Sequence, residues 1–274
     1  GRAEPSGAPA IAAWIAARLG TPTVFVGAVG DDAHGRLIHD ALSAAGVDPA
    51  HLAVRADRPT AAATVRYRPD GSREFSFAVV DSAATTLDDA DLAGLPEQAD
   101  WLHLSGSAVL FGDPLAHTVE AAARRAQMVG ATVSVDPNLR AELDNVDLRD
   151  RLAALCRAAD VLFPSDGELS GLGLDEDELL AAGRVICRTS GADGARLRVG
   201  HVDIAVPAVA SAEQVVDADG AGDTFAGATI AARLAGQDWP SAVRTAAGLV
   251  ARAIAVPGPM TVDLDPSDLH AARP

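Results

Sequence analysis

The residues best able to do chemistry lie in one short segment, 215–225, where two glycines and several acids precede an alanine-rich stretch. The pattern predicts a short strand, a tight turn and a helix whose first residue is Asp223. Gly220 and Gly222 let an anion approach the main chain, and a helix N-terminus attracts phosphate through its unpaired N–H groups and its dipole. A carboxylate there would repel phosphate, but beside a transferring phosphoryl group it can accept the proton of an attacking hydroxyl. The segment therefore indicates a kinase that acts on an alcohol.

Other interpretations of this segment are simpler. Asp223 could be the N-cap of the helix, because Asp is a favoured capping residue. A dinucleotide-binding loop is disfavoured, since Gly220, Gly222 and Gly227 miss the G-x-G-x-x-G spacing. A Walker A loop is excluded, because no Lys-Ser/Thr pair follows the glycines.

Residues 217–223 also resemble the D-T-x-G-A-G-D signature of the ribokinase-like (PfkB) carbohydrate kinases. Four further segments resemble motifs of this family and occur in the family's order. They are 7–20, similar to the second half of the G-G-x-x-x-N signature and the helix after it; 26–35, similar to V-G-x-V-G-D-D-x-x-G; 136–140, similar to D-P-N-x-R; and 189–195, similar to the nucleotide-binding G-x-x-G segment. Because these motifs span nearly the whole chain, the sequence is identified as a member of this family.

The resemblance implies a role for each matching residue. Asp223 would be the catalytic base, and the amides of Gly220, Ala221 and Gly222 would form the anion hole for the γ-phosphoryl group of ATP. Glu168 stands where a family acid helps to place Mg²⁺ through water. Asp217 lies where the family can bind a monovalent cation such as K⁺. The other residues assigned to the nucleotide are Ser165, Arg188, Thr189, Ser190, Gly191, Ala192, Asp193 and Gly194.

The implied acceptor is a hydroxyl of a sugar or sugar acid, contacted by Gly7, Asn138, Arg140 and Asp223. The D-P-N-x-R motif is that of the fructokinase and 2-keto-3-deoxygluconate kinase members, so it favours those substrates over ribose or adenosine. The guanidinium of Arg140 suits the carboxylate of a sugar acid. It could equally orient phosphates or hold its loop through Asp136.

Several positions depart from the family's pattern. Ile11 stands in place of a sugar-binding Asn, Ser6 in place of a Gly, Ala218 in place of a Thr and Ser165 in place of an Asn. The family's first strand, whose Asp binds sugar hydroxyls, is expected to be missing. These departures keep a second function open, a degenerate member that binds nucleotide or sugar without turnover as a sensor or partner protein. Retention of Asp223 argues for turnover, since a pure binder has no need of a base.

Composition limits the class of protein. The 274 residues are 49% hydrophobic and carry a formal net charge of -16, which argues against nucleic acid as a partner because its binders carry basic stripes. Binding of ATP then requires Mg²⁺ and local cations, for which Arg140, Arg184 and Arg188 are candidates. Cys156 and Cys187 are expected to be buried thiols in a reducing compartment. No apolar run reaches the roughly 20 residues of a membrane span and no signal peptide opens the chain, so we expect a cytoplasmic enzyme.

Strand and helix patterns alternate along the chain, which is typical of an α/β fold. Together with the resemblance, this predicts a single ribokinase-like domain over 1–274, with a mostly parallel central sheet flanked by helices. Asp136, Ser165, Thr189 and Asp217 each follow directly on a predicted strand. Ligands of open α/β sheets bind beyond the carboxyl ends of the strands, so we expect these four residues to line one cleft.

Residues 55–82 break the alternation. The stretches 61–68 and 74–80 alternate in polarity on either side of the turn sequence at 69–72, which predicts a β-hairpin. In the resembling family such strands form a lid over the sugar and often pair with a second subunit. We therefore expect a small β lid and a homodimer formed through it. A plain edge hairpin of the main sheet is the alternative.

Overall fold

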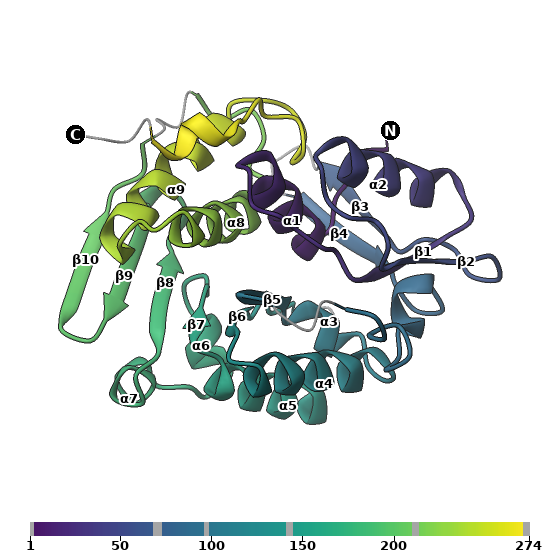
Figure 1. Cartoon of the computed structure of the whole chain (residues 1–274), viewed down its shortest axis with the longest axis horizontal. Helices are drawn as coiled ribbons and strands as arrows, with labels where there is room; N and C mark the ends of the chain where they lie inside the picture. Colours follow the sequence, from purple (N-terminus) through teal and green to yellow (C-terminus); the bar gives the residue numbers. More distant parts are fainter. Residues whose placement is uncertain (1–2, 68–72, 96–98, 141–144, 210–213, 271–274) are drawn as a thin grey trace.

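A six-stranded sheet forms the centre of the protein, in the order β10-β9-β8-β7-β6-β5 (Figure 1). The computed structural model describes residues 3–67, 73–95, 99–140, 145–209 and 214–270. Strands β5 to β8 run parallel, and β9 and β10 are antiparallel to their neighbours. The mostly parallel sheet that the sequence predicts is therefore confirmed. Its strands are β5 (Trp101–Ser105), β6 (Thr132–Asp136), β7 (Val161–Leu162), β8 (Val185–Thr189), β9 (Ala195–Val199) and β10 (Val202–Val206).

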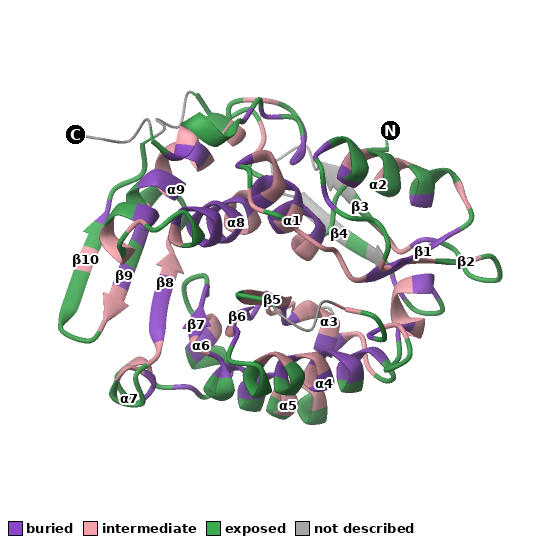
Figure 2. Ribbon diagram, viewed as in Figure 1, coloured by how far each residue is buried: buried purple, intermediate pink, exposed green. Residues whose placement is uncertain are grey.

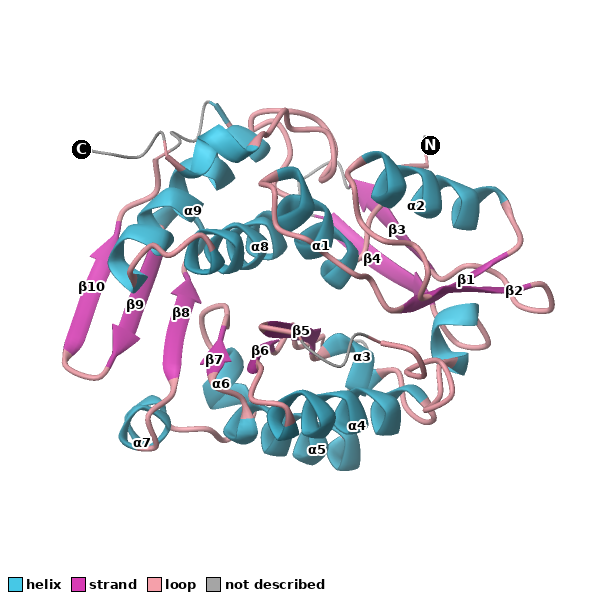
Figure 3. Ribbon diagram, in the orientation of Figure 1, coloured by secondary structure: helices cyan, strands magenta, loops and turns pink. Residues whose placement is uncertain are grey.

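Helices cover both faces of this sheet (Figure 3). One hydrophobic core lies between the sheet and the helices α1, α8 and α9, and a second lies between the sheet and α4 and α5. The short helices α3, α6 and α7 sit in connections between strands. The α-helices are α1 (Ala8–Arg18), α2 (Ala33–Ala44), α3 (Ser107–Leu110), α4 (Leu115–Met128), α5 (Val146–Ala158), α6 (Glu168–Gly171), α7 (Glu176–Ala181), α8 (Ala221–Leu234) and α9 (Trp239–Ala253).

Strand β8 shows how the sheet divides the two cores. Successive side chains of a strand point to opposite faces. Cys187 accordingly packs in the core with α8 and α9, and Ile186 packs in the core with α4 and α5. Both residues are fully buried, and Figure 2 shows buried residues along α8 and in β8.

Two small sheets lie outside the central one. Strand β1 (Gly27–Gly30) pairs in parallel with β2 (Leu52–Arg55), and β3 (Ala62–Tyr67) pairs antiparallel with β4 (Arg73–Ala78). The hairpin is therefore a separate sheet, which rules out the alternative of an edge hairpin of the main sheet. Its turn, 69–72, lies outside the described residues.

One carboxylate joins the end of β1, the start of α2 and the chain that leads into the hairpin. Asp32 caps α2 by accepting a hydrogen bond from the Gly35 amide at 2.8 Å, and it also accepts from the amide and hydroxyl of Thr60 at 2.8 and 2.7 Å. The Thr60 hydroxyl in turn accepts from the Gly30 amide at 2.9 Å. The hydrogen bonds from Thr60 and Gly35 lower the pKa of Asp32 to about 2. The start of the hairpin is thus anchored to the α2 N-terminus by a permanent charge.

The structure corrects two local expectations. Residues 215 and 216 do not form a strand before the glycine turn; the amide of Val216 donates to the carbonyl of Ile254 at 2.8 Å. The apolar run at 23–29 predicts one strand, but only Val24 forms an isolated bridge before β1 begins at Gly27.

Two expectations drawn from composition agree with the structure. Cys156 and Cys187 are buried free thiols, and burial raises the pKa of both. Within the described residues, no helix combines the length and apolar character that a membrane crossing requires.

Candidate active site

The N-terminus of α8 has the geometry of an anion site. Gly220 is the N-cap and adopts the left-handed conformation, with φ 71° and ψ 12°, so that α8 begins at Ala221. Asp223 is therefore the third residue of the helix and not its first. No side chain caps α8, so the interpretation of Asp223 as an N-cap is wrong.

The amides of this turn are available to a ligand. Among the described residues, the N–H groups of Gly220, Gly222 and Asp223 have no backbone or side-chain acceptor, and the Ala221 amide makes only a long contact of 3.4 Å with the Ala218 carbonyl. A Cβ added at Gly222 would have nothing within 4 Å. Several donors without a protein acceptor thus lie at the end of the helix where its dipole is positive, with open space beside Gly222.

Two glycines explain why α8 sits where it does. A Cβ at Gly220 would lie 2.8 Å from Ile11 Cδ1 and 2.9 Å from Pro259 Cβ. A Cβ at Gly227 would lie 2.5 Å from the carbonyl oxygen of Ala12 in α1. Both positions therefore require the absence of a side chain, and α8 packs directly against α1. Ile11 is fully buried in this contact, so it serves the core beneath the turn.

Asp223 lies at the edge of a large cavity. The cavity has a volume of about 2240 Å³, and Asp223 lines it. Asp223 is half-buried, and burial raises its pKa to about 7, with a further contribution from the charge of Asp219. Arg140 acts in the opposite direction. A carboxyl group with this pKa is matched to proton transfer near neutral pH.

All residues that the sequence assigns to the sugar line this one cavity, namely Gly7, Asn138, Arg140 and Asp223. Ala62, Ala63 and Thr64 of β3 line it as well. Sequence analysis missed Ser105 and Ser107, which also line the cavity and whose hydroxyls lie 2.9 Å apart. Their position at the carboxyl end of β5 could have indicated them, because ligands bind beyond the carboxyl ends of parallel strands. Asp136 at the end of β6 was predicted on that ground.

The turn after β6 carries a cluster of charge. Asn138 has a positive φ of 42°, and its amide donates to Asp136 Oδ1 at 2.9 Å. Burial raises the pKa of Asp136 well above its ordinary value, and the charges of Asp223 and Glu168 add to the effect. Arg140 forms no ion pair with any described residue, but its charge lowers the pKa of Asp136. The hypothesis that it holds its loop through Asp136 is therefore supported by charge and not by a direct contact.

Glu168 joins this turn to the turn after β7. Its Oε1 accepts from the Leu139 amide at 2.7 Å, and its Oε2 accepts from the Ser165 amide at 2.7 Å. Burial raises the pKa of Glu168, while these two hydrogen bonds and Arg140 lower it. The carboxylate thus connects the substrate turn to the segment assigned to the nucleotide.

The residues assigned to the nucleotide come together, but away from the cavity. Ser165 forms an isolated parallel bridge with Thr189, and their hydroxyls are 3.3 Å apart. The 190–194 loop is closed by a hydrogen bond from the Ser190 amide to the Gly194 carbonyl at 2.8 Å. The cavity that Asp223 lines is not lined by Ser165, Glu168, Arg188 or residues 189–194. The residues expected to line one cleft therefore lie in two neighbouring regions, which Glu168 connects.

Two of the three arginines expected to face ATP form ion pairs with other residues of the protein instead. Arg184 pairs with Asp160 at 3.6 Å, and Arg188 pairs with Glu176 at 2.8 Å. Arg140 is the one of the three that lines the cavity.

Asp217 does not follow a strand as expected. Its Oδ1 accepts from the Asp219 amide at 3.0 Å, and its Oδ2 accepts from the Gly258 amide at 3.2 Å. In the part of the chain that the structure describes, no group of three or more His, Cys, Asp or Glu side chains is arranged to hold a metal ion. The assignment of a monovalent cation to Asp217 stays a prediction.

Comparison with known proteins identifies the family. A family model described as "pfkB family carbohydrate kinase" matches residues 2–265. The chain belongs to the pfkB family of carbohydrate kinases. It is an ATP-dependent sugar kinase with a ribokinase-like fold, as the sequence predicts.

Relatives and solved structures that are similar to this chain support the assignment to the pfkB family. Fructokinase of Klebsiella pneumoniae is 34% identical over 241 residues, covering 83% of this chain and 76% of that protein. A crystal structure described as a ribokinase II from E. coli, in complex with ATP and Mg²⁺, is similar with a TM-score of 0.90 at 30% identity, covering 98% of this chain and 89% of that one. Fructokinase from Vibrio cholerae O395, with fructose, ADP and calcium ion bound, has a TM-score of 0.82 at 30% identity and covers 97% and 90%.

The two glycines of the α8 turn give a matched pair of substitutions. We expect Gly220→Ala to lower the free energy of unfolding by about 1–3 kcal/mol, because the residue would hold a strained φ and its methyl group would overlap Ile11 and Pro259. Gly222→Ala meets no neighbour and should leave the melting temperature unchanged or raised, while its methyl group narrows the approach to the free amides and weakens ATP binding. Chemical denaturation and calorimetric titration with ATP measure the two effects. Equal loss of stability in both variants would contradict this account.

Proposed function

We propose that this kinase transfers the γ-phosphoryl group of ATP to a hydroxyl of a ketohexose such as fructose, with Asp223 as the general base. The observation that carries the proposal is the placement of Asp223. Its carboxyl group borders the cavity that the sugar-assigned residues share, and it stands in the first turn of a helix whose N-terminal amides have no acceptor among the described residues.

Asp223 has two requirements to meet in this reaction. It must be ionised before transfer, and its pKa of about 7 leaves it about half ionised at neutral pH. It must then take the proton of the sugar hydroxyl as the oxygen bonds to phosphorus, so that no free alkoxide forms. Both are compatible with a carboxyl group that is partly desolvated but open to the cavity.

The free amides of α8 would hold negative charge on the transferring group. Mg²⁺-bound ATP would supply the electrophilic phosphoryl group. The fit rests on the unpaired N–H groups of Gly220, Gly222 and Asp223 and on the open space at Gly222. Fixed donors aimed at developing charge contribute about 3 kcal/mol each in other enzymes. Glu168 would place Mg²⁺ through water, and the 189–194 loop with Ser165 would hold the nucleotide.

The hairpin β3–β4 would close over the sugar and pair with a second copy of the chain. Ala62, Ala63 and Thr64 supply one wall of the cavity, which supports the lid role. A solved fructokinase from Vibrio cholerae, a double mutant with fructose, ADP and potassium ion bound, is the precedent for a K⁺ site, and Asp217 would be its ligand here.

A sugar acid of the 2-keto-3-deoxygluconate type is the second candidate substrate. One observation favours it: Arg140 lines the cavity and forms no ion pair with another described residue, although its charge acts on the acids Asp136, Glu168 and Asp223. A carboxylate on the substrate would pair with this group.

The central test is Asp223→Asn, assayed for ATP consumption against fructose, other ketoses, sugar acids and nucleosides. Asn is isosteric and cannot take a proton, so we expect kcat to fall by roughly 10²–10⁴-fold, the usual contribution of a general base, while calorimetry shows ATP binding retained. A variant with near-normal kcat would refute the base assignment. A wild-type protein that binds ATP or sugar yet turns over no substrate in the panel would instead support the non-catalytic alternative.

The activity should depend on pH through Asp223. The base works as a carboxylate, so kcat/KM should fall as the pH is lowered through about 7. Asp219→Asn removes a charge that raises this pKa, and we therefore expect the acid limb to move to lower pH. Asp40→Asn, which removes an equal charge from an exposed position of α2, is the control and should leave the limb in place. If the acid limb of Asp219→Asn stayed at the same pH as that of the wild type, the assignment of Asp223 as the base would be contradicted.

Arg140→Met separates the two substrate classes. If the guanidinium binds a carboxylate, KM for 2-keto-3-deoxygluconate should rise by about tenfold or more, the value of one charge-assisted hydrogen bond, with little change in KM for fructose. The assay belongs at pH 9, because Arg140 also lowers the pKa of Asp223 and its loss would otherwise reduce the ionised fraction. Equal KM changes for both sugars would exclude a carboxylate partner, and Arg140→Lys should preserve most of the effect of the charge.

A further inference from the structure

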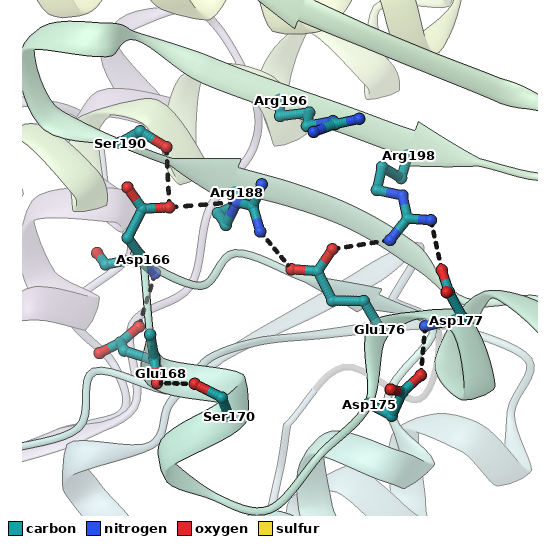
Figure 4. Close-up of polar contacts among 12 residues, drawn as sticks. Asp166, Glu168, Ser170, Asp175, Glu176, Asp177, Arg188, Ser190, Arg196 and Arg198 are labelled. Carbon is teal, nitrogen blue, oxygen red and sulfur yellow. Dashed lines mark hydrogen bonds and ion pairs between the residues drawn. The ribbon is translucent and has the colours of Figure 1, made fainter.

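Three arginines lie along one face of β8 and β9 (Figure 4). Arg188 in β8 is the cross-strand neighbour of Arg196 in β9, and Arg198 follows two residues later on the same face. Arg188 and Arg198 share the carboxylate of Glu176, and Arg196 pairs with Asp203. Arg188 is the one whose partners reach the segments assigned to the nucleotide.

Arg188 points away from α8. It shares its face of β8 with Ile186, which packs in the core of α4 and α5, whereas Cys187 packs in the core of α8 and α9. Its guanidinium is also engaged by carboxylates of the protein, since Nη1 donates to Glu176 Oε1 at 2.8 Å and Nε forms an ion pair with Asp166 Oδ1 at 3.3 Å that is not a hydrogen bond. The side chain is therefore placed to hold protein groups together and not to contact phosphate directly.

The contacts of Arg188 continue into both nucleotide segments. Asp166 Oδ1 accepts a hydrogen bond from the Ser190 hydroxyl at 3.0 Å, and the Asp166 amide donates to the Thr189 carbonyl at 3.1 Å. Asp166 belongs to the turn that includes Ser165 and leads to Glu168, and Ser190 begins the 190–194 loop. One carboxylate thus ties the two segments to each other, and Arg188 holds that carboxylate (Figure 4).

The other end of this chain of contacts is anchored on α7. Glu176 accepts from Arg188 through Oε1 and from Arg198 through Oε2, at 2.8 and 2.9 Å. Arg198 also donates to Asp177 at 2.5 Å. Two cations therefore fix the first turn of α7, and their common carboxylate restrains the position of Arg188.

We propose that Arg188 is a positioning residue for ATP, which orders the 164–168 turn and the 190–194 loop through Asp166 without touching the nucleotide. This rests on the proposed function, because it takes those two segments to be the nucleotide site. Ordering a loop before binding removes an entropic cost from the binding step, so loss of the link should weaken nucleotide affinity and leave the sugar cavity and Asp223 unaffected.

The test is calorimetric titration with ADP, in the absence of sugar, of Arg188→Met and Ser190→Ala. Arg188→Met removes the cation that holds Asp166, and Ser190→Ala removes the last hydrogen bond of the path while all ion pairs stay. We expect each to weaken ADP binding about tenfold, the effect of one charge-assisted hydrogen bond, and to raise KM for ATP similarly, with KM for the sugar unchanged. The second variant keeps the test valid if the first unfolds.

Arg196→Met is the matched control. Arg196 is the neighbour of Arg188 on the same face and forms a bidentate pair with Asp203 at 2.6 and 2.8 Å. Among the described residues, its side chain forms no hydrogen bond or ion pair with the 164–168 turn or the 190–194 loop. It should leave ADP affinity unchanged. Unchanged ADP affinity in Ser190→Ala, or equal losses in Arg196→Met and Arg188→Met, would overturn the positioning role while leaving the kinase assignment intact. Failure of the wild type to bind ADP would overturn both.

Discussion

The direct contact between α8 and α1 is the constraint on which the rest of the site depends. The two helices approach so closely that Gly227 has no room for a Cβ beside the Ala12 carbonyl, and Gly220 has none beside Ile11. This contact fixes the end of α8 at the wall of the cavity. The position of Asp223 and of the free amides relative to α1 follows from it.

The same arrangement places several acids near one another. Burial raises the pKa of Asp136, Glu168 and Asp223. A carboxyl group whose pKa rises on folding binds its proton more tightly in the folded state, so for Asp223 the stability of the fold declines as the pH rises from about 4 to about 7. The site thus costs stability at neutral pH, and Arg140 offsets part of that cost because it lowers the pKa of all three acids.

Two sets of polar contacts lie next to this cluster of acids. Glu168 joins the turn after β6 to the turn after β7 through two backbone amides. On the far face of β8, the ion pairs of Arg188 and Arg198 connect α7 to the turn that carries Asp166. The segments assigned to substrate and nucleotide come from different loops, and these side chains connect them.

The sequence by itself determined the family and the α/β order, and it predicted the separate hairpin and residues that line the cavity. Each depends on local pattern or on residue types at fixed spacing, such as Gly220, Gly222 and Asp223 in one turn. It mistook the exposed Val216 for part of a strand, because an apolar run carries no information on whether another strand is present to pair with it.

Only the tertiary structure decided what depends on segments distant in the chain. It showed that Asp223 is not a cap, that Ile11 is buried beneath the turn, and that Arg188 is held by Glu176 and Asp166. It also raised the pKa of Asp223, since desolvation is a property of the surroundings and not of the residue. Residue type and spacing indicate which groups are available for chemistry, but packing sets which of them face the cavity and in what state of charge.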